Sequence, residues 1–462
     1  MSTTVAIVVV LGLLTICGLG VLALLGAAGS AGGLIRISPV APLAGMAWVG
    51  IAAATAATVG IGLGAAGLVA VTVATCAGGA VRLARSAETP LPRTRRRARP
   101  FELAFAGAAV VVLVVVSGYA LATYGIKPLV EYDGWAMWGM KARAIALVDA
   151  DPAVLASDAY ARLHLEYPLL LPALHALPID VAESFASNIV VLNCVVVGLA
   201  GLLAIWGLLR DRARPAVLLP FVAAIAALPA FFWQLGSGYA DVPVAMLVAA
   251  GVGAAARWLV DEDASWLALA TLFLAASTLT KNEGLLFAVA VLVPLFAVAK
   301  DRRRVVALAA GVVALVYAPW RAYMAVHDLG SPAYDLSSSF DPGWVAPRLR
   351  RVPEAVSGVV EKAIDPHELG LLLVLGVACS ILALVLGQRR LGLFALGFGA
   401  LSLAGLSWIY VIAPLEVSSF VGSSGSRVVV SAVVGLATLS PLLVEECART
   451  LDAQAESPAG SR

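Results

Sequence analysis

Apolar residues along the chain come in runs of 16 to 25 residues, and short polar segments separate these runs. About 20 helical residues match a hydrocarbon core of roughly 30 Å, so each run predicts a membrane-spanning helix. The apolar stretch 40–81 is too long for one span, and we expect two spans that break near Gly60–Gly64. The other predicted spans are 4–28, 102–124, 186–208, 215–234, 241–259, 264–280, 284–299, 305–325, 369–387, 391–412 and 428–444.

These runs predict an all-α polytopic membrane protein with about thirteen transmembrane helices. Composition agrees, because 61% of the residues are hydrophobic and only 13% are charged, too few to cover a water-soluble fold of 462 residues. The first run, Thr4 to Ala28, lacks a basic start and is too long for the core of a secretory signal, so we expect a retained helix.

Positive charge is concentrated in four connections between the predicted spans. Short loops rich in Lys and Arg stay on the cytoplasmic side of a membrane, and all four connections fall on one side when the spans are threaded. The connections contain Arg82 to Arg99, Arg210 to Arg214, Lys300 to Arg304, and Arg389 with Arg390. The amino terminus is then outside if three spans precede Arg82, and inside if two do.

The net charge is only +2 and Arg gathers at span ends, so the basic residues indicate topology and lipid headgroup contact, not nucleic-acid binding. A basic cytoplasmic linker, 86–100, separates N-terminal helices (1–85) from a larger membrane domain (101–444). The polar tail 445–462 is expected to be disordered and cytoplasmic. The five cysteines lie in or beside predicted spans, which argues against a disulfide framework.

The opposite side receives the long segments 125–185, 326–368 and 413–427. In the first of them, Glu131, Asp133, Trp135 and Lys141 fall within twelve residues. One interpretation is an aromatic anchor with solvated acids. The other is a carboxylate acting as general base, with the pair of tryptophans as the wall of a sugar or lipid site. A short interfacial helix is predicted after Trp135.

The same loop contains Glu166 and Tyr167, followed by an apolar stretch with Pro172 and Pro178. Proline breaks regular helix, so we expect short helical pieces here in a folded loop that supports the site.

Two further polar groups stand at predicted span ends on this side. Asp241 opens an inward span, where it serves as a helix cap, as part of a site, or as both. Lys281, Asn282 and Glu283 join two short apolar runs, where uncompensated charge is costly. Lys281 is a candidate phosphate ligand, and Glu283 is a candidate partner for Lys281 or for Arg321. The alternative is an internal salt bridge that holds the hairpin.

The last outer segment ends in Arg427, against the usual charge asymmetry, after a run of Ser and Gly. Such a run lets backbone approach an anion, so we interpret Arg427 as a phosphate ligand, with a snorkelling Arg as the alternative. All four histidines also fall on this side, but no two have the close spacing of metal ligands, so the sequence does not support a divalent cation.

The order of these motifs resembles that of bacterial GT-C glycosyltransferases related to protein O-mannosyltransferases and lipid A aminoarabinose transferases. The resemblance covers roughly residues 115–444. It rests on Tyr132-Asp133-Gly134-Trp135, Glu166-Tyr167-Pro168-Leu169-Leu170, Gly238-Tyr239-Ala240-Asp241-Val242-Pro243, Leu279-Thr280-Lys281-Asn282-Glu283-Gly284 and Ser424-Gly425-Ser426-Arg427.

The resemblance implies inverting transfer of a sugar from a polyprenyl-phosphate donor to a cell-envelope acceptor, outside the bacterial cytoplasmic membrane. Asp133 would be the general base, with Glu131 as substitute, and Lys281 and Arg427 would stabilise the leaving phosphate. Two features depart from the family: about three helices precede the span that leads to the catalytic loop, and the aromatic and proline that follow the Arg in many relatives are missing. The rival hypothesis is a transporter or flippase of a lipid-linked or anionic sugar.

Overall fold

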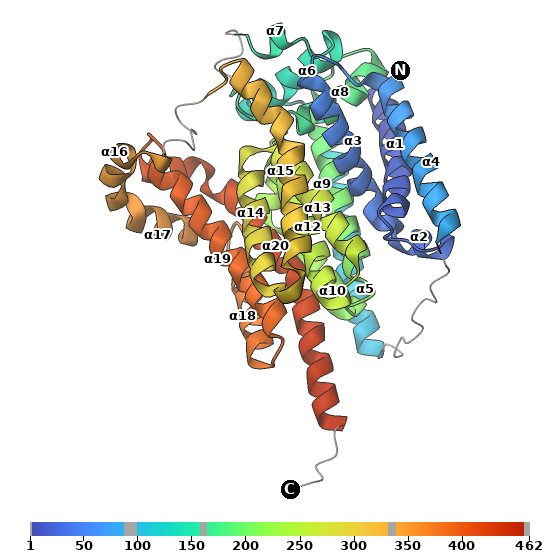
Figure 1. Ribbon diagram of the computed structural model, residues 1–462, viewed down its shortest axis with the longest axis vertical. Coiled ribbons are helices and arrows are strands. Elements are labelled where there is room, and N and C mark those ends of the chain that lie inside the picture. Colours follow the sequence, from blue (N-terminus) through green and yellow to red (C-terminus); the bar gives the residue numbers. More distant parts are fainter. Residues whose placement is uncertain (1, 87–98, 158–163, 331–338, 457–462) are drawn as a thin grey trace.

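The protein is a bundle of helices in a computed structural model that describes residues 2–86, 99–157, 164–330 and 339–456 (Figure 1). The first part contains α1 (Thr3–Leu24), α2 (Ala31–Ile37), η1 (Ser38–Val40), α3 (Ala41–Ala57), α4 (Gly64–Arg85) and α5 (Pro100–Tyr124). Short helices follow before the next long one: η2 (Gly134–Gly139), α6 (Met140–Leu147), α7 (Pro152–Leu155), α8 (Leu170–Ala182) and α9 (Asn188–Leu209).

The second half of the chain continues the bundle and adds a lateral projection. Its inner helices are α10 (Pro215–Ala227), α11 (Pro229–Leu235), α12 (Asp241–Asp261), α13 (Ala264–Thr280), α14 (Asn282–Val298), η4 (Lys300–Arg302) and α15 (Arg303–Val326). The projection and the last helices are α16 (Pro342–Val345), η6 (Ala346–Arg351), α17 (Val352–Ala363), α18 (Leu372–Val385), α19 (Arg389–Ile412) and α20 (Val417–Glu456).

The described part contains nine helices that are long and apolar enough to cross a membrane. The pair α10 and α11 makes a tenth span if it is counted as one helix, bent by 61° where Pro229 begins α11. Helices α13 and α14 have 17 residues each and α18 has 14, so they fall short of a full span. The chain is therefore a multi-pass helical membrane protein, and the count of thirteen spans stays a prediction.

The predicted break within 40–81 is confirmed. Helix α3 ends at Ala57 and α4 begins at Gly64, and between them Gly60 has a φ of +75°, in the left-handed region that glycine adopts without strain. Three candidate spans thus precede the basic segment after α4, and Arg82 lies in the last turn of the third. Ile7 of α1 packs against Ala142 of α6, so the amino terminus lies at the end of the bundle that carries the short helices α6 to α8 (Figure 1).

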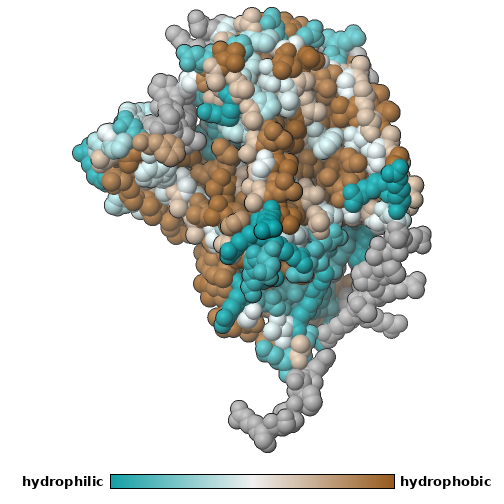
Figure 2. All heavy atoms as spheres, viewed as in Figure 1, coloured by the Kyte–Doolittle hydropathy of each residue, from teal (hydrophilic) through white to brown (hydrophobic). Residues whose placement is uncertain are grey.

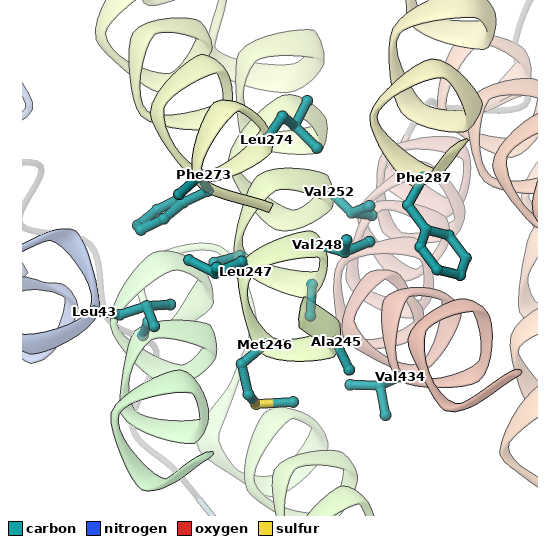
Figure 3. Packing of buried hydrophobic residues seen from close by; sticks show 14 of the residues in the cluster. Leu43, Ala245, Met246, Leu247, Val248, Val252, Phe273, Leu274, Phe287 and Val434 are labelled. Atoms are coloured by element: carbon teal, nitrogen blue, oxygen red, sulfur yellow. The ribbon is translucent and has the colours of Figure 1, made fainter. Parts of the chain in front are cut away.

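Helix α12 forms the centre of the bundle, and 94% of its most apolar stretch is buried. It is rich in Ala, Gly and Val, and such small residues let neighbouring helices approach closely. Its side chains Leu247, Val248 and Val252 meet Phe273 of α13 and Val434 of α20 in the core (Figure 3). This packing brings α12, α13 and α20 together, and each of these helices contributes to the site described below.

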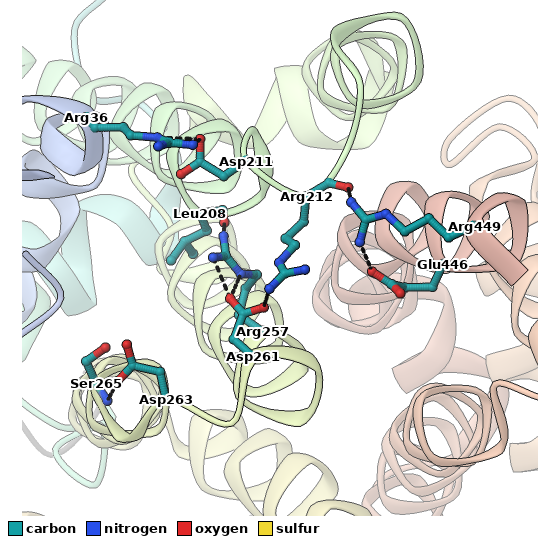
Figure 4. A network of polar contacts seen from close by, with 10 residues as sticks. All are labelled: Arg36, Leu208, Asp211, Arg212, Arg257, Asp261, Asp263, Ser265, Glu446 and Arg449. Atoms are coloured by element: carbon teal, nitrogen blue, oxygen red, sulfur yellow. Dashed lines mark hydrogen bonds and ion pairs between the residues drawn. The ribbon is translucent and has the colours of Figure 1, made fainter. Parts of the chain in front are cut away.

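The end of the bundle opposite to α6 is held by Arg-centred ion pairs, and we call it the basic end. Arg212 pairs with Asp261 at the end of α12, and Arg257 bonds to the same carboxylate (Figure 4). Further pairs join the other connections: Arg36 with Asp211, Arg214 with Glu445, and both Arg302 and Arg390 with Glu262. Polar residues gather at this end (Figure 2), so the predicted basic connections do meet on one side.

Three local predictions are wrong. Residues 417–427 are not a loop, because α20 begins at Val417. The segment 445–456 is not disordered but continues α20 through Glu456. Helix α8 runs unbroken over 13 residues despite Pro178 inside it. The basic linker falls largely on 87–98 and the last tail residues on 457–462, outside the described residues.

Candidate functional site

Asp133 stands at the start of a π-helical turn, η2, at the end of the bundle opposite to the basic end. The wide turn brings the backbone of Gly134 against the segment before α12, since a Cβ on Gly134 would lie 2.4 Å from the Ser237 carbonyl oxygen. π-Helical turns occur frequently at functional sites. The predicted short helix after Trp135 is confirmed as η2 and α6, and it anchors Asp133 beside the polar start of α12.

The Asp133 carboxylate accepts a hydrogen bond from Nη1 of Arg427 at 2.8 Å. Arg427 lies in the third turn of α20, so the contact joins the first long loop to the last helix. The side chains are 28% and 23% exposed, respectively, which leaves both accessible to a ligand. The Nε of Arg427 is buried and makes no hydrogen bond.

Tyr239 provides the aromatic surface of this pair. The Arg427 guanidinium lies over its ring, 4.7 Å from the centroid, in a cation–π contact, and Trp233 meets the same ring edge-on. Burial and the nearby Asp133 carboxylate raise the pKa of the Tyr239 phenol to about 12. Tyr239 is therefore neutral at physiological pH and can act there only as a neutral hydrogen-bonding group.

Lys281 forms a second, buried set of ion pairs with two acids. Its Nζ donates to Oδ1 of Asp241 at 2.7 Å and lies 3.1 Å from Oε1 of Glu283. Ala240 is the N-cap residue of α12, and Asp241 pairs with Lys281 from the first turn of the helix, where a carboxylate also suits the helix dipole. Helices α13 and α14 approach closely here, because a Cβ on Gly284 would lie 1.8 Å from the Ser277 carbonyl oxygen.

The two sets form one electrostatic unit, since the charges of Asp241 and Arg427 interact. We call these residues, Asp133, Asp241, Lys281, Glu283 and Arg427, the charged cluster. It contains three acids and two cations, which gives a net charge of −1 when all are ionised. The Oε2 of Glu283 is buried without a hydrogen-bond partner. The cluster is thus able to accept one positive charge.

A neighbouring group supports the cluster from α6. Lys141 is 1% exposed, and its Nζ donates to the carbonyl oxygens of His164 and Tyr167 at 2.8 and 2.9 Å. Burial lowers the pKa of Lys141 to about 7, although the nearby Glu166 carboxylate acts against this shift. These two hydrogen bonds make Lys141 a brace for the segment 164–167, and its role in substrate binding stays a prediction.

Glu166 and Tyr167 are also buried, at 6% and 5% exposure. The Glu166 carboxylate lies 2.9 Å from Nδ1 of His164. Tyr167 packs edge-on against Trp138 and contacts Ala240, the residue before Asp241. These residues connect η2 to the start of α12 and so fix the distance between Asp133 and Asp241.

The remaining predicted residues lie around the cluster. Glu131 is 3.9 Å from Nζ of Lys127, and Asn282 is the half-buried first residue of α14. Trp135 is 45% exposed, but Trp138 is 1% exposed, so the two tryptophans do not form one open wall. No group of three or more His, Cys, Asp and Glu in the described ranges is arranged to hold a metal ion.

Sequence reasoning missed two contributions to the site. Tyr239 belongs to the motif Gly238–Pro243, and its place two residues before Asp241 could have predicted that it lies at the site. Tyr410 of α19 lies 2.9 Å, oxygen to oxygen, from the hydroxyl of Ser424, one turn before Arg427, and nothing local in the sequence indicates that contact. Together they hold the Arg427 turn of α20 against α12 and α19.

Comparisons with known protein families, curated proteins and solved structures find no match to this chain. The fold and the site define a class without them. The chain is a polytopic helical membrane protein with an ion-paired charged cluster at one end of its bundle and an Arg-rich network at the other.

Proposed function

We propose that the protein is a GT-C type glycosyltransferase that transfers a sugar from a polyprenyl-phosphate donor to a cell-envelope acceptor, with inversion. It works on the non-cytoplasmic face of the bacterial cytoplasmic membrane. The observation that carries the proposal is the Asp133–Arg427 pair: a half-exposed carboxylate beside a cation, at the end of the bundle opposite to the Arg-rich connections.

The chemistry needs a base and an anion ligand close together. Asp133 takes the proton of the acceptor hydroxyl while the oxygen of that hydroxyl bonds to the anomeric carbon of the sugar. The bond between that carbon and the phosphate oxygen breaks, and its electron pair stays on the leaving polyprenyl phosphate. Arg427 stabilises this anion, as preorganised cations do for leaving groups in other transferases.

The charge balance of the cluster favours base chemistry. With three acids and two cations, the cluster carries one excess negative charge, and a proton taken up by Asp133 makes it neutral. Lys281 takes a different role from the one that the sequence suggested, because Asp241 and Glu283 already engage its ammonium group. In the proposal it holds Asp241 toward Arg427, and Arg427 binds the phosphate.

The rival hypothesis, a transporter or flippase, expects charge along a path through the membrane. The buried charged residues of the described part are Lys141, Glu166, Asp241, Arg257, Lys281 and Glu445. The first five lie near helix ends or in connections, and Glu445, inside α20, is paired with Arg214 at the basic end, which supports the transferase.

The decisive experiment gives purified protein a radiolabelled polyprenyl-phosphate sugar and a cell-envelope extract. We expect transfer of label by the wild type, loss of transfer in Asp133→Asn, and retained transfer in Glu131→Gln. Glu416→Gln, an exposed acid at the same end, is the matched control for charge removal. Full transfer by Asp133→Asn would remove this base from the mechanism, and no turnover of any such donor by the wild type would favour the transporter.

A further inference from the structure

A lateral projection at the site end has no role in the proposal above. It consists of residues 341–364, and we call it the arm; it contains α16, η6 and α17 and extends sideways from the bundle beside α19 (Figure 1). The indole nitrogen of Trp344 donates to the Ile412 carbonyl oxygen at 2.9 Å, and Arg351 donates to that of Ala413 at 2.8 Å. The arm is thus fastened to the carbonyl end of α19.

One face of α17 is buried against α20. Ala355, Val359 and Ala363 recur every four residues and are 0% exposed. The contact is close, because a Cβ on Gly425 would lie 2.9 Å from Cγ of Lys362. Gly425 is two residues before Arg427, so α17 packs on the turn of α20 that leads into the charged cluster.

The adjacent face of α17 is apolar and uncovered. Val356, Val360 and Ile364 also recur every four residues, and they are 44%, 39% and 44% exposed. We call these three residues the exposed stripe. The next helix along the chain, α18, carries exposed aliphatic side chains of the same kind, such as Leu375 and Ile381. Figure 2 shows apolar atoms on the side of the arm that faces the basic end.

The third face of α17 is polar. Glu354, Ser357 and Glu361 are exposed and lie opposite to the buried face at helical spacing. A helix that packs on protein with one face, shows aliphatic residues on the next and charges on the third has the pattern of an interfacial helix. Arg350, exposed beside the exposed Leu349, adds a cation suited to phosphate headgroups.

We propose that the arm is an interfacial anchor: the exposed stripe enters the lipid leaflet at the site end, Arg350 contacts lipid phosphate, and Glu361 faces water. A lipid surface is the occupant that fits best, because the stripe is purely aliphatic and the next helix, α18, also exposes aliphatic side chains. The anchor places the nearby Arg427 at the depth of lipid phosphates. This last step rests on the proposed function: the site then binds the phosphate of a lipid-linked sugar donor held in the same leaflet.

The test places single nitroxide labels in protein whose five native cysteines are replaced by Ala or Ser, reconstituted in phosphatidylglycerol-containing nanodiscs. Labels at Val356→Cys and Val360→Cys are expected to be accessible to oxygen, which partitions into lipid, and shielded from a water-soluble nickel chelate. Glu361→Cys is the matched control and is expected to show the reverse. In protein that keeps its native cysteines, a water-soluble maleimide is expected to react with Glu361→Cys and much less with Val356→Cys or Val360→Cys.

Nickel access at Val360 equal to that at Glu361 would overturn the proposal, since the stripe would face water. Shielding of the stripe from both reagents would also overturn it, because a protein partner or a second copy would cover the stripe. The two proposals fail separately. Lipid-exposed labels in protein that turns over no polyprenyl-phosphate sugar keep the anchor and remove the transferase, whereas water-exposed labels in active protein do the opposite.

Discussion

The guanidinium of Arg427 reaches the carboxylate of Asp133 at 2.8 Å across 294 positions of sequence. The contact depends on α20 lying beside α12, because Tyr239, just before α12, supports the Arg427 guanidinium with its ring. Base and anion ligand are therefore positioned by the packing of the bundle and not by one local segment.

Replacing Arg427 by Met is expected to lower kcat of sugar transfer by on the order of 100-fold or more, because the leaving phosphate loses its cation. Arg427→Lys keeps the charge but loses the planar fork, so we expect partial activity. The measurement is steady-state transfer with a purified donor. Equal activity of Arg427→Met and the wild type would exclude Arg427 as the phosphate ligand.

Replacing Lys281 by Met leaves the buried Asp241 and the partly buried Glu283 without this cation. Loss of one partner from a buried ion pair costs about 3–5 kcal/mol, so we expect a marked drop of the melting temperature in detergent. The triple variant Lys281→Met, Asp241→Asn, Glu283→Gln removes the charges together and should recover most of the loss. No recovery in the triple variant would mean that packing of the Lys281 side chain, not charge balance, holds α13 to α14.

A methyl group at Gly284 would collide with the Ser277 carbonyl oxygen and force α13 and α14 apart. We expect Gly284→Ala to lower stability by about 1–3 kcal/mol. Gly118→Ala in α5 is the matched control, because nothing lies within 4 Å of its added Cβ and alanine is the better helix former. Equal melting temperatures for the two variants would contradict the close approach.

Glu166 predicts a pH dependence of stability. Burial acts to raise its pKa, but the hydrogen bond from His164 and the charge of Lys141 hold the pKa below its ordinary value of 4.5. Because the folded pKa is the lower one, the contribution of Glu166 is present above pH 4.5 and is lost as the pH falls through the folded pKa. The melting temperature should therefore fall more steeply below pH 4.5 in the wild type than in Glu166→Gln. Identical pH profiles for the two proteins would show that Glu166 contributes nothing.

The apolar runs and polar motifs of the sequence predicted much of the architecture. The break after Ala57 could be predicted from the length of the apolar stretch alone, and charge asymmetry predicted that Asp133, Asp241, Lys281 and Arg427 lie at the end opposite to the basic connections. All four converge in one cluster because helices distant in the sequence pack together, and no local sequence pattern predicts that packing. No periodicity of the sequence predicts the π-helical turn at Gly134 either.

The errors have a common physical cause. Ser and Gly before Arg427 favour turns in isolation, yet they are helical in α20, where Gly425 lets α17 pack closely against the helix. Pro178 stays inside α8 for the same kind of reason, since the helix is buried on nearly all sides. Tertiary packing thus overrode local propensity. The exposed stripe of α17, by contrast, has a four-residue period that the sequence itself contains.

Helix α20 runs for 40 residues, about 60 Å, which is roughly twice the thickness of a hydrocarbon core. One continuous helix, with Pro441 inside it, therefore carries Arg427 toward the site end of the bundle and Glu445, bound to Arg214, toward the basic end. The charged cluster and the basic end are thus joined by one unbroken stretch of helical main chain.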